Sequence, residues 1–169
     1  MNKLTKEQIA RVFALYMGCH VKFTTNKGHT HIAAIGALAS DAVQSADYID
    51  WYLLEQCQLI LTPLSSLTDE HAVEVAKWCD NGFRAAKDVA IKRSKETIYL
   101  TTGQCDDVSC IRIYRNFFKV ERIHEDNECN NITNTTCNRI IDLLRSYNYA
   151  LPYMGIDLYE AGIAIEPIN

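Results

Sequence analysis

The stretch that most constrains the fold lies near the C-terminus, at residues 138–166. Its first part repeats apolar residues at helical spacing with charged residues between them, which predicts an amphipathic helix. Pro152 ends that helix because proline has no backbone N–H and restricts the residue before it. Asp157 can cap a second, short helix that Gly162 ends, and residues 163–165 follow as a buried strand. We expect this segment to pack as a lid on the rest of the chain.

Two threonines mark the starts of two further helices. Thr5 and Gln8 have the spacing of a capping box, in which each side chain bonds the backbone of the other residue. Thr68 precedes Asp69 and Glu70, and acidic residues in a first turn are favourable to the helix dipole. With the amphipathic helix near the C-terminus, the pattern therefore predicts about three main helices, besides the short one that Gly162 ends.

Alternating apolar and polar residues predict antiparallel strands, with a meander at residues 96–123 as the centre of the sheet. Residues 40–51 fit either a loop or a short helix, residues 83–90 favour a strand, and residues 124–136 indicate an exposed loop. The predicted fold is α+β: an antiparallel sheet of about five or six strands with about three helices packed on it. We expect one domain over residues 1–169, the alternative being a subdivision into 1–64 and 65–169. The expected strands are residues 20–24, 30–38, 56–61, 96–102, 108–114, 117–123 and 163–165.

Composition narrows the class of protein. The net charge of −4 argues against a general nucleic-acid binder, although residues 84–122 hold nine Lys/Arg against five Asp/Glu. The chain has no apolar run long enough to span a membrane, and its first residues lack the apolar core of a signal peptide. We expect the seven cysteines to be reduced thiols in a cytoplasm.

Six short segments carry a resemblance: LTKEQIA at residues 4–10, FALYMG at 13–18, LTPLSSLTDEHA at 61–72, IDLLRS at 141–146, YALPYMG at 149–155 and EAG at 160–162. Together they resemble small accessory proteins of unknown function from phages and prophages of the Bacteroidetes. The resemblance brings no activity and no catalytic residues. It implies a phage protein that acts in the cytoplasm of a bacterial host.

Clustered metal-ligand residue types are few: Cys105 with Cys110, Cys19 with His20, and His29 with His31. Structural zinc sites use more closely spaced cysteine pairs, and Cys110 falls within a predicted strand. The sequence also has no nucleophile elbow, HExxH motif or phosphate-binding glycine loop. We therefore predict no metal, no cofactor and no catalytic residues. A metal- or thiol-dependent enzyme is the least favoured alternative.

The predicted meander offers a candidate contact surface for nucleic acid or a partner. Arg112 and Tyr114 share one side of a predicted strand, and a sheet face that mixes cations with aromatic rings can stack bases and neutralise phosphates. An ordinary solvated sheet face has the same pattern, and Glu96 and Glu121 would neutralise it. The candidate residues are Lys92, Arg93, Lys95, Arg112, Tyr114, Lys119 and Arg122.

A second candidate surface is acidic. It consists of Glu121, Glu125, Asp126 and Glu128, in or beside the asparagine-rich stretch at residues 124–136. Such a run could imitate nucleic acid and bind a basic host protein by electrostatic complementarity. A solvated loop is the simpler interpretation.

The predicted function is a non-enzymatic phage accessory protein that binds and inhibits a host macromolecule. The partner would be a host protein or ribonucleoprotein complex, such as a CRISPR nuclease complex targeted by an anti-CRISPR-type inhibitor. The alternative is a small RNA- or DNA-binding module that uses the basic and aromatic sheet face. No membrane partner is expected, and the sequence leaves the oligomeric state and the contacting surface open.

Overall fold

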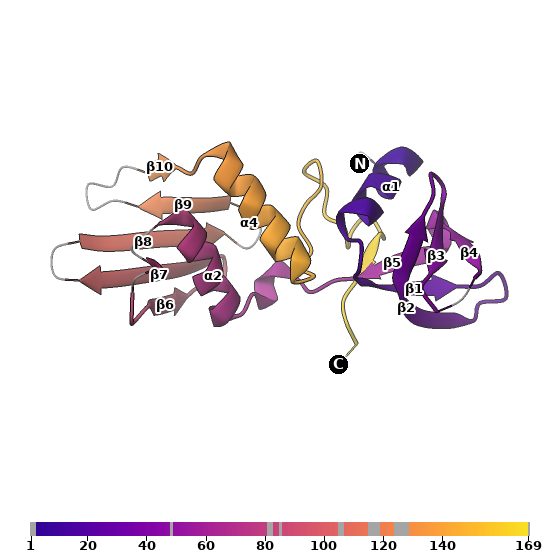
Figure 1. Cartoon of the computed structure of the whole chain (residues 1–169), viewed down its shortest axis with the longest axis horizontal. Helices are drawn as coiled ribbons and strands as arrows, with labels where there is room; N and C mark the ends of the chain where they lie inside the picture. The colour runs from indigo at the N-terminus through magenta and orange to yellow at the C-terminus, as the bar shows by residue number, and fades with distance from the viewer. Residues whose placement is uncertain are drawn as a thin grey trace. The chain divides into compact units, whose positions relative to one another are not determined.

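The computed structural model describes residues 3–47, 49–80, 83–84, 86–104, 107–114, 119–123 and 129–168. The chain forms two compact units: unit 1 comprises Met1–Pro63 and Arg145–Asn169, and unit 2 comprises Leu64–Leu144. Each unit has its own sheet and at least one α-helix, so the predicted α+β class is confirmed (Figure 1). The expected single sheet is wrong, because the N-terminal hairpin pairs within unit 1 and not with the meander.

Unit 1 begins with α1 (Lys6–Leu15), and its strands form one six-stranded sheet in the order β11-β5-β1-β2-β3-β4. The capping box at Thr5 is confirmed: its Oγ1 accepts from Gln8 N at 3.2 Å, and Gln8 Oε1 accepts from Thr5 N at 2.9 Å. The 3-10 helix η1 (Leu54–Gln56) precedes β5. The strands are β1 (His20–Thr24), β2 (Thr30–Leu38), β3 (Ala42–Ser45), β4 (Trp51–Leu53), β5 (Cys57–Ile60) and β11 (Ala164–Ile165).

Residues 40–51 are neither the loop nor the short helix that the sequence predicts; they contain β3 and the start of β4. Val43 lies opposite Tyr52 in the register of these strands, and both side chains are buried. The register of β2 on β3 shifts at Gly36, where an added Cβ would lie 2.9 Å from Ala46 Cα. Glycine is therefore needed there for the close approach of the two backbones.

The C-terminal segment returns to the first sheet as predicted, because β11 pairs with β5 and closes its edge. The predicted second helix is wrong: residues 158–162 form a hydrogen-bonded turn. Asp157 still caps it, since its Oδ1 accepts from Tyr159 N at 2.8 Å. Gly162, at φ +73°, then turns the backbone out of the helical direction, so that Ile163 N can donate to Leu158 O at 3.0 Å.

Unit 2 contains α2 (Asp69–Cys79), α4 (Asn134–Ser146) and a five-stranded antiparallel sheet in the order β10-β9-β8-β7-β6. The predicted N-cap at Thr68 is confirmed, and the 3-10 helix η2 (Leu64–Ser66) precedes it. The predicted meander is confirmed in its strands, while its turns at residues 105–106 and 115–118 lie outside the described residues. The strands are β6 (Ala90–Arg93), β7 (Thr97–Gln104), β8 (Asp107–Tyr114), β9 (Lys119–Ile123) and β10 (Cys129–Asn131).

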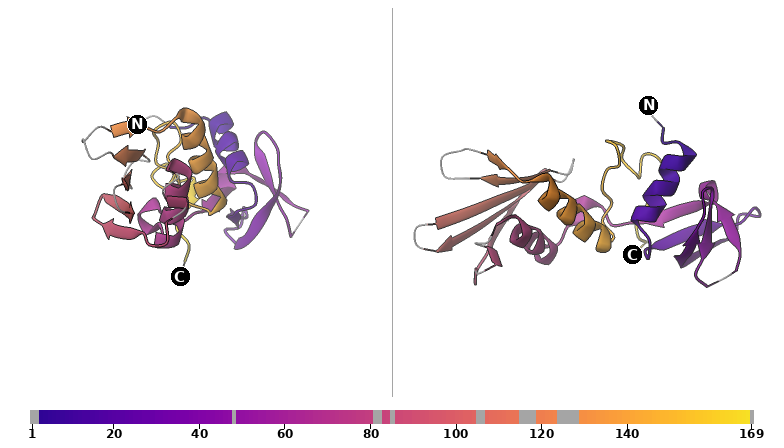
Figure 2. Two further views of the ribbon diagram at one scale, coloured as in Figure 1. Left: turned by 60° about the vertical axis from the view of Figure 1, so that its left-hand side comes forward. Right: turned by 45° about the horizontal axis from the view of Figure 1, so that its top comes forward.

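Helices α2 and α4 lie on one face of this sheet (Figures 1 and 2). On that face β7 contributes Ile98 and Leu100, and β8 contributes Ile111 and Ile113; all four side chains are fully buried. They form the core of unit 2 together with buried residues of α2 and α4, such as Val75, Ala76, Ile140 and Leu144.

Two further predictions for unit 2 are corrected. Residues 83–90 are not a strand: Phe83 and Arg84 are helical, and β6 begins only at Ala90. The predicted loop at residues 124–136 contains β10 and the first turn of α4, while residues 124–128 lie outside the described part. Thr133 Oγ1 accepts from Thr136 N at 3.3 Å, so the helix begins before its predicted start at residue 138.

A buried hydroxyl joins α1 to the C-terminal segment, and its removal tests that link. Tyr16 Oη donates to Tyr149 O at 2.9 Å and accepts from Leu151 N at 3.0 Å. Tyr16→Phe removes both hydrogen bonds and takes away the acceptor of the buried Leu151 N–H, so we expect the free energy of unfolding to fall by about 1–3 kcal/mol. Urea denaturation followed by circular dichroism measures it. Tyr153→Phe is the control, since the Tyr153 hydroxyl has no hydrogen bond within the described residues, and an equal loss in both variants would contradict the prediction.

Candidate functional site

The face of the second sheet away from the helices carries charged and aromatic side chains. Strand pairing aligns Lys92 of β6 with Tyr99 of β7, Tyr99 with Arg112 of β8, and Arg112 with Glu121 of β9. Directly paired residues share a face, so these four side chains form a row across the strands. Adding the neighbouring pair Tyr114 and Lys119, we call this set the open face.

Glu121 is the centre of the open face. Its side chain is only 10% exposed, and its carboxylate lies 2.7 Å from Lys119 Nζ and 3.8 Å from Arg112 Nη1. Tyr114 Oη donates to Glu121 Oε2 at 3.1 Å and accepts from Arg112 Nη1 at 3.3 Å. Arg112 also lies over the Tyr99 ring at 5.7 Å, and Lys119 over the Tyr114 ring at 5.8 Å. The open face is thus a connected network of charges and rings.

The network shifts the pKa values of Glu121 and Arg112. The hydrogen bond from Lys119, helped by the one from Tyr114, lowers the pKa of the Glu121 carboxyl below its usual value, against the effect of burial. The hydrogen bond to Tyr114 raises the pKa of Arg112. Arg112 and Lys119 are therefore both paired with the nearly buried carboxylate of Glu121. Lys92 is the remaining cation of the row.

Three predicted contact residues lie elsewhere. Arg93 is on the helix-covered side of the sheet, where Nη2 donates to Leu67 O at 2.7 Å and the guanidinium forms a salt bridge with Asp69. Arg122 is opposite Ile111 on that same side, with Nη1 4.0 Å from Asp80 Oδ2. Their grouping with Arg112 is wrong, because strand alternation turns them to the other side. Lys95 is exposed between β6 and β7, and Glu125, Asp126 and Glu128 lie outside the described residues.

Unit 2 has a second cluster that was not predicted from the sequence, formed by Trp78, Arg84 and Arg139. Trp78 lies near the end of α2 and is 39% exposed. The Arg84 guanidinium lies 6.0 Å from the centre of its ring, and the Arg139 guanidinium of α4 lies 5.8 Å from it. We call these three residues the Trp–Arg cluster. Its one sequence signal is that Trp78 is out of phase with the buried residues Ala72, Val75 and Ala76.

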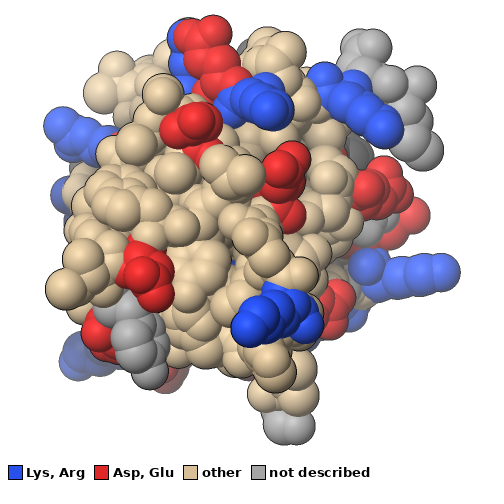
Figure 3. Space-filling model, turned by 90° about the vertical axis from the view of Figure 1, so that its right-hand side faces the viewer, with Lys and Arg blue, Asp and Glu red and all other residues tan. Residues whose placement is uncertain are grey.

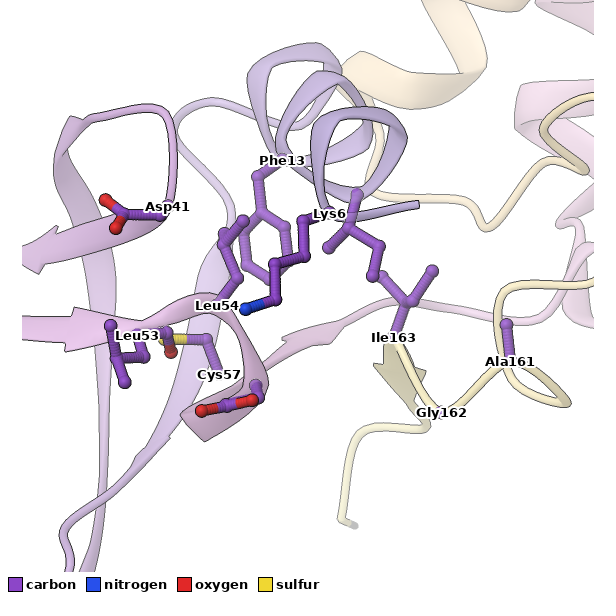
Figure 4. Close-up of a pocket in the computed structure, with 11 residues that line it drawn as sticks. Lys6, Phe13, Asp41, Leu53, Leu54, Cys57, Ala161, Gly162 and Ile163 are labelled. Carbon is purple, nitrogen blue, oxygen red and sulfur yellow. The ribbon is translucent and has the colours of Figure 1, made fainter. Parts of the chain in front are cut away.

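Unit 1 has a pocket of about 290 Å³ beside α1 (Figure 4). Phe13, Leu54 and Cys57 supply buried apolar walls, while Lys6 and Asp41 are exposed at its rim. This volume is near the lower limit of ligand pockets. The side of unit 1 visible in Figure 3 is mostly uncharged, with Lys/Arg and Asp/Glu interspersed and not gathered into a patch of one sign.

The described cysteines and metal-ligand side chains give little support for a thiol nucleophile or a metal site. Burial raises the pKa of Cys57 to about 12, and has the same effect on Cys19 and Cys79. The thiolate is the nucleophilic form, so Cys57 is a poor nucleophile at neutral pH although it lines a pocket. Among the described residues, no three His, Cys, Asp or Glu side chains are grouped to hold a metal ion. No helix in that part of the chain is long and apolar enough to cross a membrane.

Comparisons with protein-family models, with curated proteins and with solved structures find no match to this chain. The relation to phage accessory proteins therefore stays a prediction.

The role of Glu121 can be tested through pH. Because its folded-state pKa is lowered, its contribution to stability is present above the usual value of about 4.5 and is lost as the pH falls through the folded-state pKa. We expect Glu121→Gln to lower the free energy of unfolding by about 1–3 kcal/mol at neutral pH. That loss should shrink below pH 4.5. Urea denaturation at several pH values measures it. The control is Glu96→Gln, at an exposed carboxylate in the same unit, and a loss independent of pH would contradict the assignment.

The state of Cys57 can be tested by alkylation. A pKa of about 12, against the ordinary 9.0, lowers the thiolate fraction at pH 8 about a thousandfold. We expect the rate at which iodoacetamide modifies Cys57 to be about a thousandfold lower in the folded protein than in urea. Peptide mass spectrometry measures both rates. Folded and unfolded rates within about tenfold of each other would show a reactive thiol and restore the thiol-enzyme alternative.

Proposed function

We propose that this chain is a non-enzymatic accessory protein that binds a host macromolecule and inhibits it, the partner being a protein or a ribonucleoprotein. The observation that carries the proposal is the open face: tyrosine, arginine and lysine side chains on an antiparallel sheet, held in place around Glu121. Tyrosine and arginine are enriched where proteins meet, because they combine large contact area with hydrogen bonding. A surface already ordered before binding loses less conformational freedom on association.

The same geometry favours a protein partner over nucleic acid. Phosphate groups would have to draw Arg112 and Lys119 away from Glu121, leaving a carboxylate that is 10% exposed without its cations. Leaving a nearly buried carboxylate without its counter-ions is unfavourable, although less so than in a fully buried pair because the two cations are 38% and 51% exposed. With Arg93 and Arg122 on the other side of the sheet, the open face keeps little charge to offer a polyanion.

The setting of the proposal comes from the sequence. The segments that resemble Bacteroidetes phage proteins support a phage protein working in the cytoplasm of a bacterial host. A small binding protein in that setting serves the phage by occupying a host defence complex, and an anti-CRISPR-type inhibitor is the specific form of this idea. The open face supports the binding step, and the identity of the target is what the experiment must supply.

The experiment is a pull-down of the tagged full chain from phage-infected bacteria that express defence systems, with proteins and nucleic acids both identified. The test variant is Lys92→Glu with Tyr99→Ala, which changes the open face but leaves the Glu121 pairs in place. The matched control is Lys87→Glu, at an exposed lysine outside the sheet. We expect a stoichiometric host complex with the wild-type chain and with the control. Capture by the test variant should be weaker by about tenfold or more.

Three results would decide against parts of the proposal. Capture of nucleic acid alone, without a protein complex, would favour the nucleic-acid alternative, as would binding that weakens steeply with salt and is lost in Arg112→Ala with Lys119→Ala. Equal capture by the test variant would remove the open face from the interface. Failure to capture any host complex, together with failure to protect phage from any defence system, would contradict the inhibitor function.

A further inference from the structure

The Trp–Arg cluster is a separate surface of unit 2 with its own chemistry. Trp78, Arg84 and Arg139 come from α2, from the segment after it, and from α4, so three parts of the chain converge on one exposed indole. Arg84 Nε also donates to Lys77 O at 2.9 Å, which fixes this guanidinium beside the ring. The fold thus holds two cations against one exposed aromatic ring.

The two guanidinium groups have unused capacity for acceptors. Within the described part of the chain neither Arg84 nor Arg139 forms a salt bridge with a carboxylate. Two acids close to Trp78 in the sequence are paired with other cations, since Glu74 pairs with Lys77 at 2.9 Å and Asp80 lies 4.0 Å from Arg122. A guanidinium packed against a ring can still donate from its N–H groups, and those groups match a carboxylate in geometry.

We propose that the Trp–Arg cluster is a docking surface for an acidic segment of the partner protein, with carboxylates on Arg84 and Arg139 and an apolar side chain on the Trp78 ring. The proposal rests on the proposed function, because it names the chemistry of the same partner. Charge complementarity selects the occupant. Both arginines are exposed and have no carboxylate partner among the described residues, so carboxylates of a partner can replace the water around them. Tryptophan and arginine are also enriched in binding hot spots.

Trp78 itself is the reporter for the test. The chain has two tryptophans, so Trp51→Phe leaves Trp78 as the only one. The probe is a short polyglutamate peptide, titrated into the full chain while Trp78 fluorescence is followed. Polylysine and oligothymidylate of similar length are the comparison probes. We expect a saturable change with polyglutamate that weakens with salt, and no change with polylysine.

The test variant is Arg84→Gln with Arg139→Gln in the Trp51→Phe background, and it should weaken polyglutamate binding by about tenfold or more. The matched control is Lys87→Gln with Lys95→Gln, which removes the same charge from exposed lysines of unit 2 that lie outside the open face. Circular dichroism must show that both variants are folded.

Each other outcome has a definite meaning. No fluorescence change, or equal weakening in the test and control variants, would overturn the proposed docking surface. A tighter response to oligothymidylate than to polyglutamate would overturn the choice of an acidic protein segment in favour of nucleic acid. The pull-down separates this proposal from the proposed function: a host complex captured equally by Arg84→Gln with Arg139→Gln keeps the function and removes the Trp–Arg cluster from the interface.

Discussion

The pairing of β7 with β8 is the constraint on which unit 2 depends. Its register aligns Ile98 with Ile113 and Leu100 with Ile111 on the helix-covered side, and Tyr99 with Arg112 on the other. Because side chains alternate along a strand, a slip of one residue would bring Arg112 into the core and expose the isoleucines. The hydrophobic core and the open face are therefore fixed by the same set of backbone hydrogen bonds, and the burial of the apolar side holds the polar side in place.

The features that the sequence predicted correctly are mostly those set by residues close together in the chain. The caps at Thr5 and Thr68 and the alternation along β7 and β8 each depend on neighbours a few residues away. The short strands β4 and β6 were missed, since three or four residues hold too little periodicity to be distinguished from a loop. The assignment of strands to two sheets was also beyond the sequence, because pairing such as that of β11 with β5 joins residues far apart in the chain.

Some features of the candidate site could also be predicted from nearby residues, and others required the structure. Alternation alone separates Arg122 from Lys119, so that part of the predicted surface could be corrected without a structure. The approach of Arg84 and Arg139 to Trp78 could not, because it depends on how α2 and α4 lie against each other. The capture of Arg112 and Lys119 by Glu121 required the register of β8 on β9. A count of charges in a segment does not reveal which of them are already paired.

Whether a cation is already paired decides which Lys and Arg side chains of residues 84–122 can bind a partner. Arg93 is held by Asp69, and Arg112 and Lys119 are held by a buried carboxylate whose loss of partners would be costly. Arg84 is held against an aromatic ring, an interaction that leaves its N–H groups able to donate. The open face therefore offers an ordered surface with little free charge. The Trp–Arg cluster offers two cations that pair with no carboxylate in the part of the chain that the structure describes. A partner with acidic side chains gains more from the second surface, and one with a polar, uncharged surface gains more from the first.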